Sequence, residues 1–467
     1  MGQKQQSTSD PTADPKKRRR VAFSSIDAGV EAKDCIQIFL VSSKEEVGLS
    51  SSFYVEPADL SRFFEDDGKI YGYQGLKITV WVSILSFHAY ADILFESSSD
   101  GGKGITDLKS ALQSIFADTL VESKDEFLQT FSTASNFIGS VVSTGEVLSQ
   151  KTSNGHVSGS NSQVEAATSD LEVVRMVVGK TAAGPLYCRL VPLVFLLVDG
   201  SSPIDVMDPR WELYLLIQKK TDQQGKFQCK LLGFTAVYRF YHYPDSHRLR
   251  LSQILVFPPY QHKGYGRYLL EALNSVALSE DVYDLTVEEP LDYFQHVRTC
   301  VDIQHLLDYD PVQDAVKSAV LHLKQGKLSK KPQTPRLMPT ASTIVDVRKS
   351  LKINKKQFLR CWEVLIYLGL DPVDKYMDDY VSIIASHMRE DIIGKDSGTA
   401  GKQVIEVSTD YDPEMSFVMF RSESGEATST FQIDENQSNQ EEQLRQLVDE
   451  RVQEIKLIAQ KVSPNPV

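Results

Sequence analysis

The chain has 467 residues, 41% of them hydrophobic, and a formal net charge of −13 at pH 7. This length indicates two or three domains with ample material for packed cores. The acidic balance argues against general binding of DNA or RNA and suits a cationic partner. If the charge is considered by itself, an acidic surface that merely aids solubility is the simpler explanation.

Two further classes of protein are not indicated. We recognise no secretory signal, and no apolar run approaches the roughly 20 residues that a membrane-spanning helix needs. The five cysteines are odd in number and widely scattered, without a CxxC pair or a Cys/His cluster. We therefore expect an intracellular protein with reduced thiols, no disulfide framework, no bound metal and no membrane contact.

The first 22 residues are polar and basic, without a hydrophobic period, and are predicted to be disordered. Within them lies a block of five cations: Lys16, Lys17, Arg18, Arg19 and Arg20. Nuclear import receptors recognise blocks of this form. A solvated basic arm that binds nucleic acid or an anionic membrane is the alternative.

Residues 23–131 are predicted to form an N-terminal α/β domain, with strands at 35–41 and 76–87 and helices at 107–116 and 125–131. Residues 132–170 follow. Their centre, 149–162, is rich in Ser, Gly and Asn, and the composition predicts a flexible insertion or linker.

Residues 171–305 form the central domain of the prediction. Its longest apolar run, 190–198, contains Pro192 and suggests a buried strand over 189–198. The further elements expected are a meander pair at 211–218 and 230–239, a strand at 249–257, a helix at 266–278, a strand at 284–287, and a helix that Asp292 caps.

Residues 306–467 are predicted to be mainly helical, with a strand pair at 403–408 and 416–421. The last helix, 441–462, has apolar residues at 444, 448, 452, 455, 459 and 462. These positions share one face, which we expect to pack on the body of the protein rather than to form a coiled coil.

The most informative run joins an apolar strand, a Pro258-Pro259 break, a glycine loop and an amphipathic helix. This order places unobstructed backbone N–H groups at a helix N-terminus, which attracts phosphate. The loop lacks the Gly-Lys-Ser/Thr end of a P-loop and the third glycine of a Rossmann fingerprint. Its Gln-x-x-Gly-x-Gly pattern resembles the acetyl-CoA pyrophosphate loop of the GNAT acetyltransferases; a plain turn is the alternative.

The order of elements also resembles the GNAT fold, which implies an α/β protein with a mixed, mostly antiparallel, splayed sheet and flanking helices. An N-terminal α/β domain and a mainly helical C-terminal region would accompany it. The resemblance implies that acetyl-CoA is the co-substrate, and that its pantetheine arm bonds to Ile254, Leu255 and Val256. Its pyrophosphate would lie against Gln261, His262, Lys263, Gly264, Tyr265, Gly266 and Arg267.

Glu288 and Glu289 end the strand after the phosphate-binding helix, where cofactor and substrate should meet. A lysine nucleophile must lose its proton, and its free pKa of about 10.4 puts that cost near 4 kcal/mol at neutral pH. A positioned carboxylate can accept the proton. Strand alternation would let only one of the two face the thioester, and an exposed acidic strand end is the alternative.

Several stretches resemble the type B histone acetyltransferase catalytic subunits: 71–77, 205–211, 237–245, 252–253 with the whole glycine loop and helix that follow, 286–290 and 353–356. The resemblance spans about residues 30–371, and the last ninety residues extend beyond it. It implies Glu288 as catalytic base, with Glu289 and Asp199 as supporting carboxylates. It also implies a tail-binding groove formed by Trp211, Tyr238, Asp66 and Asp67, although the two aromatic residues alone would be assigned to the core.

Tyr293 follows the strand end and could protonate the leaving thiolate, or simply pack. The predicted function is direct acetyl transfer from acetyl-CoA to a lysine side chain, and the resemblance implies that the lysines lie in the N-terminal tail of new, non-nucleosomal histone four. The resemblance adds a WD-repeat histone chaperone as partner and a cytoplasmic pool, while the basic block predicts the nucleus as the other location. Another GNAT enzyme, acting on a small amine or a protein N-terminus, and a non-catalytic tail-binding module are the alternatives.

Overall fold

A computed structural model describes residues 29–49, 51–64, 68–153, 169–198, 200–221, 227–324, 337–370, 374–393 and 437–463. The basic block, the strand pair predicted at 403–421, Asp66, Asp67 and Asp199 lie outside these ranges. The chain divides into two compact units: residues 1–234 with 255–261, and residues 235–254 with 262–467.

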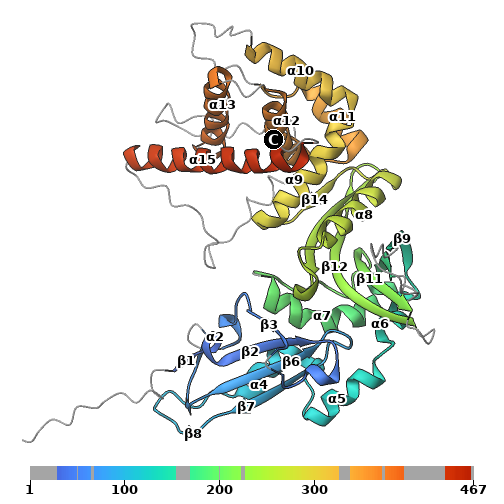
Figure 1. Cartoon of the computed structure of the whole chain (residues 1–467), viewed down its shortest axis with the longest axis vertical. Coiled ribbons are helices and arrows are strands. Elements are labelled where there is room, and N and C mark those ends of the chain that lie inside the picture. Colours follow the sequence, from blue (N-terminus) through green and yellow to red (C-terminus); the bar gives the residue numbers. More distant parts are fainter. Residues whose placement is uncertain are drawn as a thin grey trace, which may run out of the picture. The chain divides into compact units, whose positions relative to one another are not determined.

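The N-terminal part of the first unit contains a four-stranded sheet in the order β3-β2-β6-β7 (Figure 1). Its strands are β2 (Ile36–Val41), β3 (Phe53–Val55), β6 (Lys77–Ser83) and β7 (Ala89–Leu94). The predicted strands at 35–41 and 76–87 correspond to β2 and β6, which run parallel. Two small sheets add the pairs β1 (Val30–Glu31) with β4 (Lys69–Ile70), and β5 (Tyr73–Gln74) with β8 (Ser97–Ser98).

Helices accompany this sheet: α2 (Ala32–Cys35), α4 (Leu108–Phe116) and α5 (Lys124–Thr133). Both longer helices begin at side-chain caps. Asp107 accepts a hydrogen bond from the backbone N–H of Ser110, and Ser123 accepts one from that of Glu126. The predicted helices at 107–116 and 125–131 are therefore confirmed.

The prediction of a flexible insertion over 132–170 is wrong for much of its length. Residues there form α6 (Phe137–Val142) and β9 (Glu146–Ser153), and β10 (Ser169–Val177) begins before residue 170. β10 pairs antiparallel with both β9 and β11 (Trp211–Thr221). Neighbouring strands form hydrogen bonds with the backbone of a strand whatever its side chains are. The polar segment β9 is therefore held in the sheet by its pairing with β10. Residues 154–168 lie outside the described ranges.

The strand predicted over 189–198 is also wrong, because these residues belong to the helix α7 (Ala183–Leu197), with Pro192 inside it. A continuous apolar run has no hydrophobic periodicity, so its sequence does not distinguish a buried helix from a buried strand. Burial on nearly all sides explains the run, since Leu186, Leu190, Leu193, Val194 and Leu196 are all at most 1% exposed.

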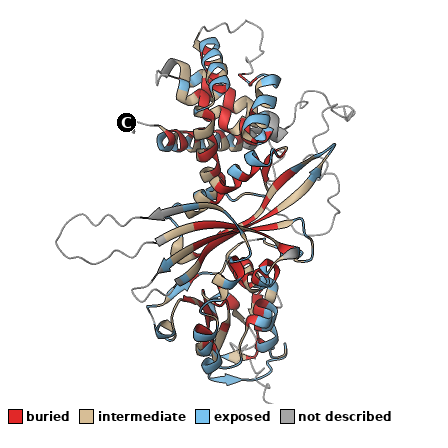
Figure 2. Ribbon diagram, turned by 90° about the vertical axis from the view of Figure 1, so that its right-hand side faces the viewer, coloured by how far each residue is buried: buried red, intermediate tan, exposed pale blue. Residues whose placement is uncertain are grey.

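Six strands form the main sheet, in the order β14-β13-β12-β11-β10-β9. The predicted strands are confirmed and longer: β11, β12 (Phe227–His242) and β13 (Ser246–Val256). The short strand β14 (Leu285–Val287) pairs parallel with β13, and α8 (Tyr265–Ser279) connects them. Many residues in the middle of the sheet are buried (Figure 2).

The C-terminal region is helical where it is described. It comprises α9 (Asp292–Leu307), α10 (Asp310–Lys324), α11 (Ala341–Leu351), α12 (Lys355–Gly369), α13 (Asp374–Ile393) and α15 (Gln437–Val462). Asp292 is the first residue of α9 and makes no capping hydrogen bond, so its predicted role as cap is wrong; Leu291 occupies the cap position.

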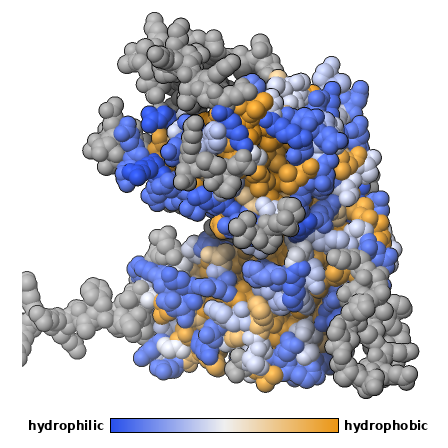
Figure 3. Space-filling model, turned by 45° about the horizontal axis from the view of Figure 1, so that its top comes forward, coloured by the Kyte–Doolittle hydropathy of each residue, from blue (hydrophilic) through white to orange (hydrophobic). Residues whose placement is uncertain are grey.

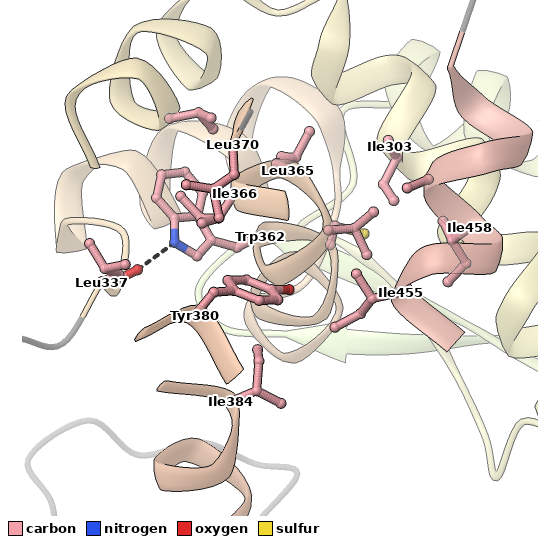
Figure 4. Packing of buried hydrophobic residues seen from close by; sticks show 14 of the residues in the cluster. Ile303, Leu337, Trp362, Leu365, Ile366, Leu370, Tyr380, Ile384, Ile455 and Ile458 are labelled. Carbon is pink, nitrogen blue, oxygen red and sulfur yellow. Dashed lines mark hydrogen bonds between the residues drawn. The ribbon is translucent and has the colours of Figure 1, made fainter. Parts of the chain in front are cut away.

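One apolar core joins these helices (Figure 4). Trp362 of α12 lies in it and donates its indole N–H to the carbonyl of Leu337 at 2.6 Å. The apolar residues predicted for the last helix are all buried in this core: Leu444, Val448, Val452, Ile455, Ala459 and Val462. The predicted packing of this helix on the body is confirmed.

Candidate functional site

The glycine loop opens α8 with a bare helix N-terminus. Gly264 is the cap residue in a left-handed conformation (φ +80°, ψ 7°), and no described side chain caps the helix. The first internal hydrogen bond runs from Tyr268 N to Gly264 O at 3.0 Å. The N–H groups of Tyr265, Gly266 and Arg267 precede that bond, so they are available to an anion.

Space beside the two glycines is open. A Cβ added to Gly264 or Gly266 would meet no described atom within 4 Å. Gln261 ties the start of the loop to the end of β13, because its Nε2 donates to Val256 O at 2.9 Å. An exposed loop with open space at its two glycines, at a helix N-terminus, has room for the pyrophosphate group that the sequence predicts there.

Arg267 contributes differently from the rest of the loop. Its guanidinium donates to Glu271 Oε1 at 2.7 Å and to Gln304 Oε1 at 2.8 Å. These bonds direct its charge along α8 and toward α9. Lys263 and His262 are exposed on the loop itself, where the lysine carries a positive charge and the histidine can acquire one. The His262 ring contacts the ring of Tyr293 edge-on, with 6.1 Å between the ring centroids.

Behind the loop, β13 continues past the end of β14, where the GNAT resemblance implies that the two strands part. β14 pairs with β13 only from Leu249 to Leu251 and ends at Val287, while β13 continues to Val256. Along this continuation Leu255 is buried, and Ile254 and Val256 are half-buried. The segment predicted to bond pantetheine is thus the part of β13 beyond its pairing with β14.

Glu288 is the first residue after β14, and two hydrogen bonds hold it. Its backbone N–H donates to Leu251 O at 2.9 Å, and its carboxylate accepts from the hydroxyl of Ser252. The side chain is otherwise exposed. A placed, solvent-accessible carboxylate at the end of the parallel strand pair is able to accept a proton from an incoming amine.

Glu289 is exposed and has a positive φ of 36°. Both glutamates therefore lie beyond the strand, in a turn, and strand alternation does not decide which of them faces the substrate. The distinguishing observation is that Glu288, unlike its neighbour, has its carboxylate hydrogen-bonded to a residue of β13.

Tyr293 lies in the first turn of α9 and is 67% exposed. This exposure does not fit the alternative of a packing tyrosine. Trp211 opens β11 and is half-buried, and Tyr238 lies half-buried in β12 with its ring 4.5 Å from that of Phe240. Neither aromatic residue is fully enclosed in a core, which leaves both with accessible surface.

Sequence reasoning did not assign a site role to Ser252. The signal was present, because β13 and β14 are parallel and Leu251 is opposite Val287. One step further along this register brings Ser252 opposite Glu288. Knowledge of the exact register is required for that step, and the apolar pattern of the two strands does not supply it.

The described residues contain no cluster of three or more His, Cys, Asp or Glu side chains arranged to hold a metal ion. Nor does that part of the chain include a helix with the length and apolarity needed to cross a membrane. The face drawn in Figure 3 is a mixture of hydrophilic and hydrophobic residues.

Comparison with known proteins identifies the family. Residues 28–199 match the model described as the N-terminus of histone acetyl transferase HAT1, and residues 202–294 match the acetyltransferase (GNAT) family model. A histone acetyltransferase type B catalytic subunit of Arabidopsis thaliana is 58% identical over 464 residues, covering 99% of this chain and 98% of the relative. The chain belongs to the histone acetyltransferase type B catalytic subunit family.

Other members differ in how far they match. A relative with the same description from Zea mays is 47% identical and covers 96% of this chain and 94% of its own length. One from Cryptococcus neoformans is 27% identical, over 68% of this chain and 76% of its own length. The expectation that the resemblance ends near residue 371 is therefore wrong for the plant relatives, whose matches run through nearly the whole chain.

Membership establishes the predicted enzyme class. The chain is a histone acetyltransferase with a GNAT domain, a domain that uses acetyl-CoA. The GNAT match spans the glycine loop, Glu288 and Tyr293. The alternative of a non-catalytic tail-binding module is accordingly set aside.

Proposed function

We propose that the enzyme acetylates lysines in the N-terminal tail of newly made, non-nucleosomal histone four, with Glu288 as general base. The observation that carries the base assignment is the double anchoring of Glu288 on β13, through Leu251 O and the Ser252 hydroxyl. Glu289 and Asp199 are assigned as supporting carboxylates.

The reaction is a direct transfer. Glu288 accepts a proton from the lysine ammonium, and the neutral Nζ forms a bond to the acetyl carbon as the carbon–sulfur bond of acetyl-CoA breaks. The sulfur leaves as the CoA thiol after it receives a proton, and we assign the exposed hydroxyl of Tyr293 as its donor. The second proton that Nζ loses on becoming the amide nitrogen passes to solvent, from which Tyr293 is protonated again. A general base placed in this way contributes about 10²- to 10⁴-fold to the rate.

This chain's residues support each part of the cofactor's binding. The N–H groups at the start of α8 and the open space at Gly264 and Gly266 suit the pyrophosphate. The continuation of β13 past Leu251 suits the pantetheine arm, which would bond along Ile254, Leu255 and Val256. No cysteine is placed in this set, so we assign no acetyl-enzyme intermediate.

The substrate assignment follows from charge and resemblance. The chain is acidic, and a histone tail is cationic and rich in glycine, which lets an extended chain lie close to a surface. We assign Trp211, Tyr238, Asp66 and Asp67 to the groove that holds it. The relatives' descriptions name histones as substrates without saying which histone.

Mass-spectrometric mapping of acetylation on the four free core histones tests the substrate. The proposal requires that histone four be acetylated first, on its N-terminal tail, and that added salt slow the reaction, since exposed charge pairs are screened over about 10 Å at 0.1 M. Free histone should react faster than nucleosomes, where DNA competes for the same cations. Preference for another histone, or equal rates on nucleosomes, would contradict it.

Two further assignments complete the proposal. A WD-repeat histone chaperone is the expected partner, and the enzyme is expected in both nucleus and cytoplasm. The block from Lys16 to Arg20 supports import, because it has the cation density that import receptors recognise. We assign no direct contact with nucleic acid or membrane.

A further inference from the structure

The strand that precedes Glu288 is short and is held from both sides. β14 has three residues, and β13 pairs with only one of its edges. On its other side, Leu285 N donates to Lys352 O at 2.8 Å, and Leu285 forms an isolated parallel bridge with Ile353. The segment between α11 and α12 therefore extends the sheet beyond β14 by a single bridge.

Two side chains converge on the carbonyl of Leu285. Asn354 Nδ2 donates to it at 3.2 Å, and Arg298 Nη2 donates to it at 3.0 Å. Arg298 comes from α9, and Asn354 is the residue before α12. Both are nearly inaccessible, at 5% and 6% exposure. A carbonyl three residues before Glu288 is thus fixed by two separate helices of the C-terminal region.

Asn354 uses both ends of its amide. Its Oδ1 accepts from Gln357 N at 2.9 Å, which caps the N-terminus of α12, while its Nδ2 reaches Leu285. A helix cap alone needs only the oxygen, and Ser, Thr or Asp would supply one. The second bond is the one that distinguishes Asn at this position.

A buried polar network supports the same contact. Arg298 pairs with Asp302 at 3.7 Å, Gln357 donates to Asp302 at 2.9 Å, and Gln295 donates to Gln357 at 2.7 Å. All four side chains are buried. Buried ion pairs add little net stability compared with apolar packing, so stability alone is a weak explanation for them. Their geometry instead fixes the guanidinium that holds Leu285.

We infer that Asn354 and Arg298 are positioning residues for catalysis, which hold β14 so that Glu288 is placed correctly for proton transfer. The inference rests on the proposed role of Glu288 as base. It makes the helices α9 and α12 part of the catalytic apparatus, through one carbonyl. Misplacement of a reacting group costs rate even when both substrates bind normally.

Asn354→Ser in the full chain tests the inference. Serine keeps an oxygen for the cap of α12 but removes the donor to Leu285 O. We expect kcat to fall about 3- to 10-fold, the effect of one lost hydrogen bond, while KM for the tail peptide and the acetyl-CoA Kd stay unchanged. Arg298→Lys, which keeps the charge opposite Asp302, should act in the same direction.

Tyr380→Phe is the matched control. Tyr380 is buried in the same helical core and donates to a backbone carbonyl, that of Glu363, at 2.9 Å, away from β14. It should lower the melting temperature by a similar amount and leave kcat unchanged. Equal kcat values for Asn354→Ser and Tyr380→Phe, with melting temperatures shifted alike, would reduce Asn354 to a structural residue and overturn the inference.

The double variant with Glu288→Gln separates the two claims. If Asn354 acts through the base, it should have no further effect once Glu288 is neutral. A further loss of the same size would show that Asn354 acts by another route. If Glu288→Gln alone keeps full activity, the base assignment fails, and the inference falls with it; if Glu288→Gln is inactive and Asn354→Ser is normal, only the inference fails.

Discussion

The hydroxyl of Ser252 donates a hydrogen bond to the carboxylate of Glu288. Ser252 is the first residue of β13 beyond its pairing with β14, and Glu288 is the first residue past β14 itself. The two therefore meet where the pairing of the parallel strands ends. This bond restrains a carboxylate that is otherwise exposed to solvent.

Ser252→Ala should lower kcat about 3- to 10-fold, because one orienting hydrogen bond is lost, with no change in acetyl-CoA affinity. Steady-state kinetics with a histone tail peptide measure the effect. Ser275→Ala is the control, since Ser275 is exposed on α8 and bonds only to the carbonyl of Glu271 at 3.0 Å among the contacts described. An unchanged kcat in Ser252→Ala would show that the hydrogen bond from Ser252 does not contribute to the catalytic role of Glu288.

Gly266→Asp should weaken acetyl-CoA binding about tenfold or more, because a carboxylate would face the pyrophosphate. The fold should tolerate it: the space is open, and an acid in the first turn of a helix is favourable. Calorimetric titration with acetyl-CoA gives the affinity, and Gly266→Ala controls for the added atoms. An unaltered Kd in Gly266→Asp would refute the assignment of this loop.

Replacement of Lys17, Arg18 and Arg19 by Ala should move a fluorescent fusion from nucleus to cytoplasm, because the import receptor would lose most of the cation block. Activity on the free tail should be unaltered, which excludes misfolding as the cause. A fusion that stays nuclear would place the import signal elsewhere, or on a bound partner.

Low pH should destabilise the packing of the C-terminal helices, because Glu363 becomes protonated. Burial alone would raise the pKa of this carboxyl, but a hydrogen bond from His387 and the charge of Arg451, 2.7 Å away, hold it below its usual 4.5. A lowered folded-state pKa gives stability that is present above pH 4.5 and is lost as the pH falls through the folded value.

Circular dichroism melting between pH 7 and pH 3 measures this loss. In Glu363→Gln the melting temperature should fall less between pH 7 and pH 3, because the carboxyl group that becomes protonated is gone. Glu450→Gln, at an exposed position of α15, serves as the control and should melt like the parent at every pH. A parent protein whose melting temperature is constant down to pH 3 would contradict the role of this ion pair.

The sequence predicted the parts of the fold that carry strong local signals. The break at Pro258 and Pro259, the glycine loop and the 3.6-residue spacing on α8 fixed the order of strand, loop and helix, and the structure confirms it. The last helix was equally predictable, because its apolar residues follow one face over about five turns.

Two errors share a physical cause: tertiary burial overrides local pattern. The helix α7 is apolar on nearly every side, so the run 190–198 has no period to read. Strand β9 is rich in Ser, Gln and Lys and resembles a linker, and only its pairing with β10 makes it a strand. In the site, the bonds from Ser252, Asn354 and Arg298 depend on register and on contacts between distant segments, which composition and spacing do not encode.

Turnover of Glu288→Gln with free histone four tail and acetyl-CoA tests the central claim most directly. The amide keeps the shape of the side chain and removes the proton acceptor, so kcat should fall by about 10²- to 10⁴-fold with the acetyl-CoA Kd nearly unchanged. Glu289→Gln and Asp199→Asn should retain more activity. Normal turnover in Glu288→Gln, together with an inactive Glu289→Gln or Asp199→Asn, would contradict the account.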